Sequence, residues 1–120
     1  MLRFDHLRLA VSDLDRSRRW YVETLGMRVE FEVPERRTVA LQDGEGFTIF
    51  LQEVATPVSP NGCALWFQVA DVDAVHDEWS ARKVAFSHPP RKTYWGYGAE
   101  LTDPDGYLVR LWDERSMKET

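Results

Sequence analysis

The chain has 120 residues, 43% of them hydrophobic and 29% charged, which suits one folded domain and excludes a wholly disordered chain. A net charge of −5 argues against a nucleic-acid backbone as partner. The single cysteine, Cys63, excludes an internal disulfide. Because the longest uncharged stretch is interrupted by proline and glycine, and the first residues lack a secretory pattern, we expect a cytoplasmic protein with no membrane segment.

Two stretches of the chain, residues 7–15 and 65–73, resemble each other. In both, apolar residues first alternate and then change to helical spacing, which predicts a strand followed by a helix. Asp13 and Asp71 are well placed to cap the two helices, and Gly26 is suited to end the first one. The sequence therefore predicts a duplicated unit.

Three further strands are predicted in each half, at residues 28–33, 37–42 and 47–54, and at residues 84–87, 97–102 and 107–112. Each half thus has the pattern β-α-β-β-β, and its last two strands are joined by an Asp- and Gly-containing turn. We expect a single α+β domain in which two βαβββ modules form a curved mixed sheet with helices on its outer face. The expected parts are module one at 1–55, a linker at 56–62, module two at 63–115 and a tail at 116–120.

Strand alternation assigns large rings, guanidinium groups and amides to the sheet face that points away from the helices, a mixture that suits a ligand cleft better than bare solvent. The candidate ligand-binding residues, with two added from a glycine-flanked loop, are His6, Arg8, Phe50, Gln52, Trp66, Gln68, Trp95, Tyr97, Arg110 and Trp112. The carboxylates of Glu53 and Glu100 are expected off this face unless the strand register shifts by one residue. In the alternative interpretation, a second sheet or a partner subunit covers the face.

The run at residues 4–17, with the Trp-Tyr and Leu-Gly-Met segments that follow it, resembles the opening of the glyoxalase / bleomycin-resistance / extradiol dioxygenase superfamily, also called the vicinal oxygen chelate superfamily. Trp95-Gly96 and the later segment 102–107 resemble its closing motif. The resemblance covers nearly the whole chain. It implies paired βαβββ modules, usually in a homodimer.

In the enzymes of this superfamily, one side chain from each of four strands holds a divalent metal. The resemblance carries these four positions onto His6, Phe50, Ala64 and Arg110. Phenylalanine and alanine have no donor atom and arginine is a fixed cation, so only His6 could ligate. Gln52 is the best spare ligand, but two donors are too few. We therefore expect no metal and no other cofactor.

These observations favour a metal-free protein that binds a planar or aromatic small molecule, with or without an anionic group, similar to the drug-binding branch of the superfamily. Arg8 and Arg110 would clamp a carboxylate or phenolate, or stack on tryptophan rings. One alternative is a lyase, isomerase or dioxygenase of the superfamily, which works without metal through His6 as general base and Arg110 as oxyanion stabiliser, or with an atypical metal site. A second alternative is a non-catalytic structural or regulatory dimer.

Overall fold

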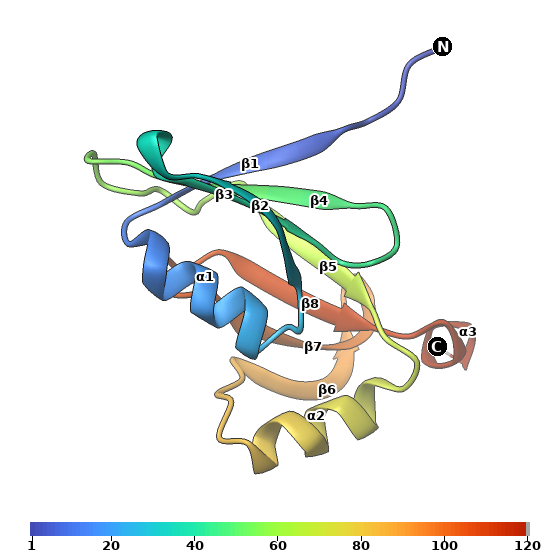
Figure 1. Ribbon diagram of the computed structural model, residues 1–120. Coiled ribbons are helices and arrows are strands. Elements are labelled where there is room, and N and C mark those ends of the chain that lie inside the picture. Colours follow the sequence, from blue (N-terminus) through green and yellow to red (C-terminus); the bar gives the residue numbers. More distant parts are fainter. Residues whose placement is uncertain (120) are drawn as a thin grey trace. The chain divides into compact units, whose positions relative to one another are not determined.

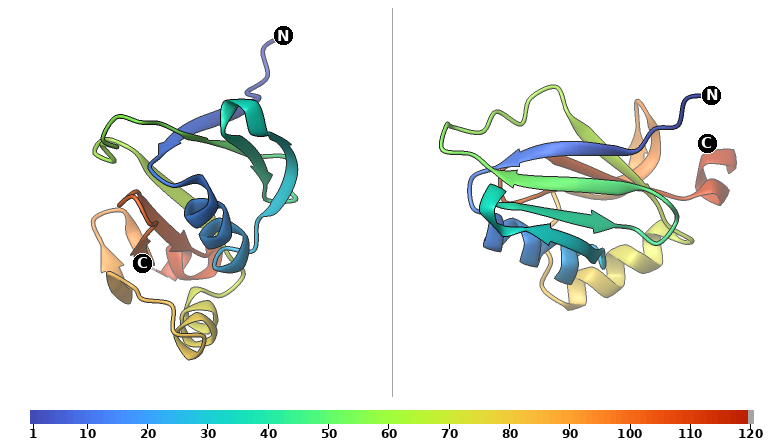
Figure 2. Two further views of the ribbon diagram at one scale, coloured as in Figure 1. Left: turned by 60° about the vertical axis from the view of Figure 1, so that its left-hand side comes forward. Right: turned by 45° about the horizontal axis from the view of Figure 1, so that its top comes forward.

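The computed structural model describes residues 1–119, which divide into two compact units at Ser59 and Pro60. We call Met1–Ser59 module one and Pro60–Thr120 module two, and each is described by itself (Figures 1 and 2). The division falls inside the segment 56–62 that the sequence marks as a linker.

Module one is a four-stranded mixed sheet with one α-helix against one of its faces (Figure 1). Its elements are β1 (His6–Val11), α1 (Leu14–Glu23), β2 (Arg28–Val33), a 3₁₀ turn (Pro34–Arg36), β3 (Thr38–Gln42) and β4 (Thr48–Glu53). The strand order is β1-β4-β3-β2, with β1 parallel to β4 and the other pairs antiparallel.

Module two repeats this arrangement, with the strand order β5-β8-β7-β6. Its elements are β5 (Ala64–Gln68), α2 (Val72–Ala81), β6 (His88–Thr93), β7 (Gly96–Thr102), β8 (Leu108–Trp112) and α3 (Glu114–Glu119). The predicted α+β fold of two βαβββ modules is confirmed. α3 begins at Glu114, inside the expected module two, and continues into the expected tail at 116–120. The last residue of that tail lies outside the described residues. Module two also carries four of the five tryptophans of the chain.

The strand predicted at residues 84–87 is wrong, because the structure places β6 at His88–Thr93. Pro89 and Pro90 disfavour a strand by local rules, since proline cannot donate a hydrogen bond to a neighbouring strand. β6 lies at the edge of its sheet, where one side of the strand needs no partner, and its register shifts between His88 and Arg91 to accommodate the two prolines. His88 begins this strand and is buried.

The predicted helix caps are present in both modules. The side chain of Asp13 accepts a hydrogen bond from the amide of Arg16 at 3.0 Å, and Asp71 does the same for Ala74 at 3.1 Å. The two Asp- and Gly-containing turns are also alike, since the first aspartate of each accepts bonds from the amides two and four residues later. The same local chemistry thus shapes both halves of the chain.

The core of each module lies between its sheet and its α-helix. The buried apolar side chains there are Leu9, Val11, Leu14, Tyr21, Met27, Val39, Leu41, Ile49 and Leu51 in module one, and Leu65, Val72, Ala99, Leu101, Tyr107, Val109 and Leu111 in module two. Ala40, which pairs with Phe50, is buried on the other side of its sheet. Alternate residues of the first and last strands fill this core, as the sequence predicted, so their neighbours face the other way. We call this second side of each sheet its open face.

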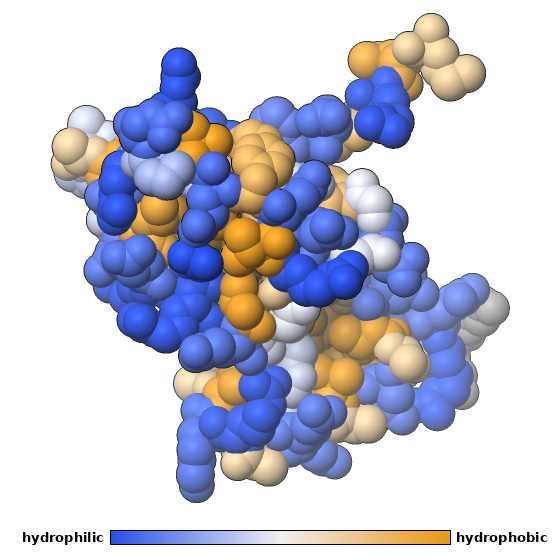
Figure 3. All heavy atoms as spheres, in the orientation of Figure 1, coloured by the Kyte–Doolittle hydropathy of each residue, from blue (hydrophilic) through white to orange (hydrophobic). Residues whose placement is uncertain are grey.

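Hydrophilic side chains cover most of the surface seen in Figure 3, with apolar side chains showing between them. Among the described residues, every helix is too short or too polar to cross a bilayer.

Candidate functional site

Phe50 lies at the centre of the open face of module one. It pairs with Arg8 on β1 and with Ala40 on β3, so it sits in an inner strand. The His6 ring stacks on it, with 3.8 Å between ring centroids and 16° between the planes. On β2, the Phe31 ring meets it edge to face at 5.5 Å and 88°. Three rings from three strands therefore form one aromatic cluster.

Polar groups surround this cluster. Arg8 Nε donates a hydrogen bond to Gln52 Oε1 at 2.5 Å, so this guanidinium pairs with a neutral amide. His6 Nδ1 lies 2.8 Å from Asp5 Oδ2, and about a third of the His6 side chain is exposed. The four candidate residues that fall in module one, His6, Arg8, Phe50 and Gln52, thus lie together on one sheet face.

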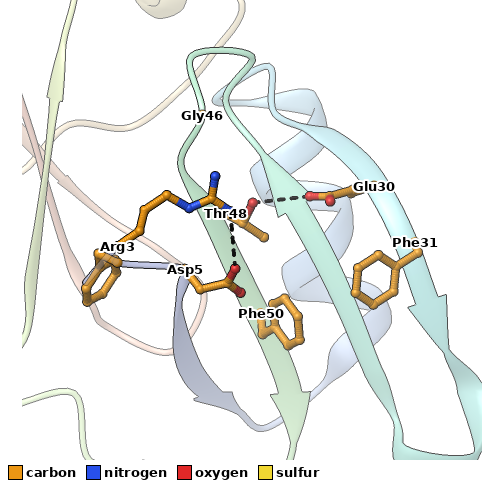
Figure 4. Close-up of a pocket in the computed structure, with 8 residues that line it drawn as sticks. Arg3, Asp5, Glu30, Phe31, Gly46, Thr48 and Phe50 are labelled. Atoms are coloured by element: carbon orange, nitrogen blue, oxygen red, sulfur yellow. Dashed lines mark hydrogen bonds and ion pairs between the residues drawn. The ribbon is translucent and has the colours of Figure 1, made fainter. Parts of the chain in front are cut away.

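A hollow of about 340 Å³ opens beside Phe50 (Figure 4). It is lined by Arg3, Phe4, Asp5, Glu30, Phe31, Gly46, Thr48 and Phe50. Of these residues, only Phe50 was among the sequence candidates.

Arg110 occupies the centre of the open face of module two and is 9% exposed. Its guanidinium carbon lies 4.7 Å from the centre of the Trp66 ring, 5.6 Å from that of Trp95 and 5.7 Å from that of Tyr94. Arg110 Nε donates to Glu100 Oε2 at 3.0 Å, in an ion pair whose two side chains are mostly buried. The Arg110 charge is therefore already matched by a carboxylate and three ring faces.

The pKa of Arg110 reflects this surrounding. Burial alone would lower it, but the hydrogen bonds to Glu100 and Tyr94 outweigh burial and raise the pKa above its ordinary value. Arg110 is consequently a fixed cation that orders its neighbours.

Trp66 and Trp95 form a perpendicular pair, with 5.8 Å between ring centroids and 89° between the planes. Trp66 is 46% exposed, so much of its ring surface remains open to a ligand. Gly98 makes room for Trp95, because a Cβ there would lie 2.4 Å from the Trp95 ring and 2.2 Å from the carbonyl oxygen of Leu111. The two rings thus lie at a right angle and form a corner on the open face of module two.

Glu100 was not among the candidate site residues, and its expected placement off the open face is wrong. It pairs directly with Arg110 across the β7–β8 hairpin and lies on the same face. The hairpin turn carries the signal, because Glu100 and Arg110 each lie five residues from Asp105 within it. Glu53, by contrast, lies off the open face as expected and accepts a hydrogen bond from the amide of Leu14.

Tyr97 is directed toward α2. Its hydroxyl donates to Asp73 Oδ1 at 2.7 Å, and this hydrogen bond, helped by burial, raises the Tyr97 pKa to about 12. The structure thus does not bring Tyr97 together with the rings around Arg110. Gln68 and Trp112 pair with each other at the ends of β5 and β8, where Gln68 is exposed and Trp112 is half-buried.

The four positions that hold metal in enzymes of the superfamily do not fit a metal here. Arg110 is a cation in an ion pair, the Phe50 ring lies against the His6 ring, and Ala64 has only a methyl group. Within residues 1–119, no three His, Cys, Asp or Glu side chains are grouped closely enough to hold an ion. A divalent metal needs three or four N, O or S donors, and this set supplies one.

Residues 3–111 match the sequence model of the Glyoxalase/Bleomycin resistance protein/Dioxygenase superfamily, and the chain belongs to this superfamily. No curated protein sequence matches the chain.

Solved structures share the fold. TnmS3, an antibiotic-binding protein from Streptomyces sp. CB03234, is 26% identical with a TM-score of 0.77, and the match covers 93% of this chain and 96% of that one. A virulence protein from Salmonella typhimurium is 25% identical with a TM-score of 0.73, over 94% and 97% of the two chains. A glyoxalase/bleomycin resistance protein/dioxygenase from Nocardioides is 17% identical with a TM-score of 0.77, over 94% and 84%.

Proposed function

We propose that this protein binds a planar aromatic small molecule without the help of a metal, as a drug-binding member of its superfamily. The observation that carries the proposal is the perpendicular pair of Trp66 and Trp95 on an open sheet face. The likeness to an antibiotic-binding protein that is 26% identical supports it.

A flat ligand can use both rings of this corner. It stacks on one ring while its edge meets the face of the other, and each such contact adds about 0.5–1.5 kcal/mol beyond the burial of apolar surface. Arg110 holds Trp66 from one side, which reduces the rotational freedom that the ring would lose on binding. The corner is therefore ordered before the ligand arrives.

Arg8, on the open face of module one, is by itself a candidate contact for a carboxylate or phenolate. Glu100 already balances Arg110, whereas Arg8 is hydrogen-bonded to the neutral Gln52.

The single free cysteine, Cys63, supports a cytoplasmic location. Membership of the superfamily supports a homodimer as the working form.

A catalytic role is the second candidate, and the pairing of His6 with Asp5 at 2.8 Å favours it. A carboxylate beside an imidazole can orient the ring and fix which ring nitrogen carries the proton, which a general base requires. Turnover of a planar aromatic compound that is lost in His6→Ala would support this function over simple binding.

Isothermal titration calorimetry with 9-anthracenecarboxylate and the uncharged 9-anthracenemethanol tests the binding proposal. We expect saturable binding of both compounds and an affinity roughly tenfold lower in Trp66→Leu, since ring stacking and burial are both lost. Trp79→Leu is the matched control, because Trp79 lies on α2 and contacts Phe86 and Arg82. Absence of saturable binding, or equal affinity in Trp66→Leu, would refute the proposal.

A further inference from the structure

The hollow beside Phe50 combines aromatic rings with carboxylates, whereas in module two the Glu100 carboxylate is already paired with the buried Arg110. Phe31 and Phe50 supply the rings, and Glu30 and Asp5 supply the carboxylates (Figure 4). We propose that this hollow is a separate site that binds an organic cation, an alkylammonium or quaternary ammonium group. This site does not depend on the planar ligand of module two.

A β-bulge in β2 creates the hollow. Val29 pairs with Leu41 of β3, and Phe31 pairs with the adjacent Ala40. Glu30 is therefore an extra residue that faces no paired residue on β3. Regular alternation would send Glu30 and Phe31 to opposite faces, whereas the bulge brings both to the open face.

The contacts of the bulge confirm this orientation. Glu30 Oε2 accepts a hydrogen bond from the Thr48 hydroxyl at 3.1 Å, and Phe31 meets the ring of Phe50 (Figure 4). The next residue, Glu32, is directed to the other side of the sheet, where it forms an ion pair with Arg18 of α1 at 2.6 Å. The bulge thus places one carboxylate and one ring side by side.

The charges that line the hollow favour a cation. Thr48 fixes the Glu30 carboxylate on one side, and His6 holds Asp5 on the other at 2.8 Å. Arg3 is the opposing charge, but it lies 3.9 Å from Asp5 and its side chain is 89% exposed. An ion pair of that kind is screened by solvent and contributes little, so the hollow keeps a surplus of negative charge.

The rings and the size of the hollow fit the same class of ligand. The faces of phenylalanine rings carry partial negative charge and attract ammonium groups, which a carboxylate nearby reinforces. A volume of about 340 Å³ lies at the lower end of the range for small-molecule sites, about 300–1,000 Å³. A small cation with a single ring attached matches this space.

Titration with benzyltrimethylammonium tests the proposal, with benzyl alcohol and benzoate as neutral and anionic counterparts. Binding is measured by calorimetry and located by amide NMR shifts. We expect the cation to bind at least about fivefold more tightly than benzyl alcohol, and benzoate to bind most weakly. The largest shifts should fall on Phe31, Thr48 and Phe50. Equal affinity for the cation and the alcohol, or shifts confined to module two, would overturn the proposal.

Two glutamates on the same strand give a matched pair of variants. Glu30→Gln should weaken cation binding about fivefold or more, while Glu32→Gln, which changes the same charge on the other side of the sheet, should stay within about twofold of the unchanged protein. Should Glu30→Gln not fold, Asp5→Asn, ahead of β1, takes its place with the same expected loss. Unchanged cation binding in the folded variant would overturn the proposal.

Two further variants separate this site from the proposed function. Phe31→Leu keeps apolar volume but removes the ring, so the preference for the cation over benzyl alcohol should fall. Trp66→Leu should leave cation binding unchanged even though it weakens anthracene binding. Loss of cation binding in Trp66→Leu would move the cation to module two and overturn the proposal.

Discussion

Glu53 and Asp113 make the same hydrogen bond in the two modules. Glu53, the last residue of β4, accepts a bond from the amide of Leu14 at 2.9 Å, and Asp113, just after β8, accepts one from the amide of Val72 at 2.7 Å. Leu14 and Val72 are the first residues of α1 and α2. Each module thus ties its last strand to the N-terminus of its helix, where a carboxylate is favourable.

Replacing Asp113 should cost more stability than replacing most surface residues. Asp113 is fully buried and also accepts the amide of Ser116 at 2.7 Å, so Asp113→Ala leaves two amide donors without their acceptor. We expect a loss of about 2–3 kcal/mol in the free energy of unfolding, measured by urea denaturation. Asp77→Ala, on the exposed surface of α2, is the control and should change it by less than about 0.5 kcal/mol. A loss in Asp113→Ala as small as in the control would contradict the role.

Acid should destabilise the protein through the same two carboxylates. The Arg37 guanidinium and then the Leu14 amide lower the pKa of Glu53 below its usual 4.5. For Asp113, burial would raise the pKa, but the Val72 and Ser116 amides outweigh it and lower the pKa below 3.8.

The sign of this pH dependence follows from the lowered values. Both groups contribute stability above the pKa of the unfolded chain and lose it as pH falls through their lower folded pKa. Denaturation midpoints measured between about pH 5 and pH 2 should therefore decrease steadily, and Asp113→Asn should flatten the decrease. A profile of Asp113→Asn parallel to that of the unchanged protein would exclude a contribution from this residue.

Removing the Glu100 carboxylate should change which ligand charge the protein prefers. In Glu100→Gln, Arg110 keeps its ring contacts but loses its counter-charge, so it becomes available to an anion. The affinity for 9-anthracenecarboxylate relative to 9-anthracenemethanol should rise about threefold to tenfold in calorimetry. Glu78→Gln on α2 should leave the ratio unchanged. An unchanged ratio in folded Glu100→Gln would show that the ligand does not reach Arg110.

Tyr97 and Asp73 should be energetically coupled. A double-mutant cycle of Tyr97→Phe and Asp73→Asn, measured by urea denaturation, should give a coupling energy of about 1 kcal/mol. Since folding raises the Tyr97 pKa from 10 to about 12, this contribution is complete below pH 10 and is lost as pH rises toward 12. The stability of Tyr97→Phe should therefore fall less than that of the unchanged protein as pH rises from 10 toward 12. Additive single effects would argue against the hydrogen bond.

Gly98→Ala should disturb both stability and ligand binding. The new Cβ would meet the Leu111 carbonyl oxygen at 2.2 Å, and backbone in a sheet moves only at a cost of about 1–3 kcal/mol. It would also displace the Trp95 ring from the corner, so anthracene binding should weaken. In the double variant of Trp95→Ala and Gly98→Ala, the clash with the ring is gone but the clash with the Leu111 carbonyl oxygen remains. Only part of the stability loss should therefore be recovered. Normal stability of Gly98→Ala would contradict this packing.

Much of the fold could be predicted because both halves of the chain carry the same sequence pattern. The aspartate caps, the alternating core residues and the two hairpin turns recur in both halves, so each half supports the interpretation of the other. The prediction failed at β6, where Pro89 and Pro90 oppose strand formation by local rules and only the position at a sheet edge permits it.

The site was partly predictable for a related reason. Alternation identifies which face Phe50, Trp66 and Arg110 occupy, but it does not identify their partners. Glu100 required the pairing of strands across a hairpin. The hollow at Glu30 and Phe31 depends on one extra residue in β2, which leaves the hydrophobic pattern of that strand unaltered and gives no signal in the sequence.

The uneven distribution of indole rings has a practical consequence for spectroscopy. Since Trp20 is the only one in module one, intrinsic emission reports mainly on module two. An unfolding curve recorded by emission alone can complete most of its change while module one is still intact. Comparison with far-ultraviolet circular dichroism, to which the strands and helices of both halves contribute, would reveal whether the duplicated halves melt as one cooperative unit.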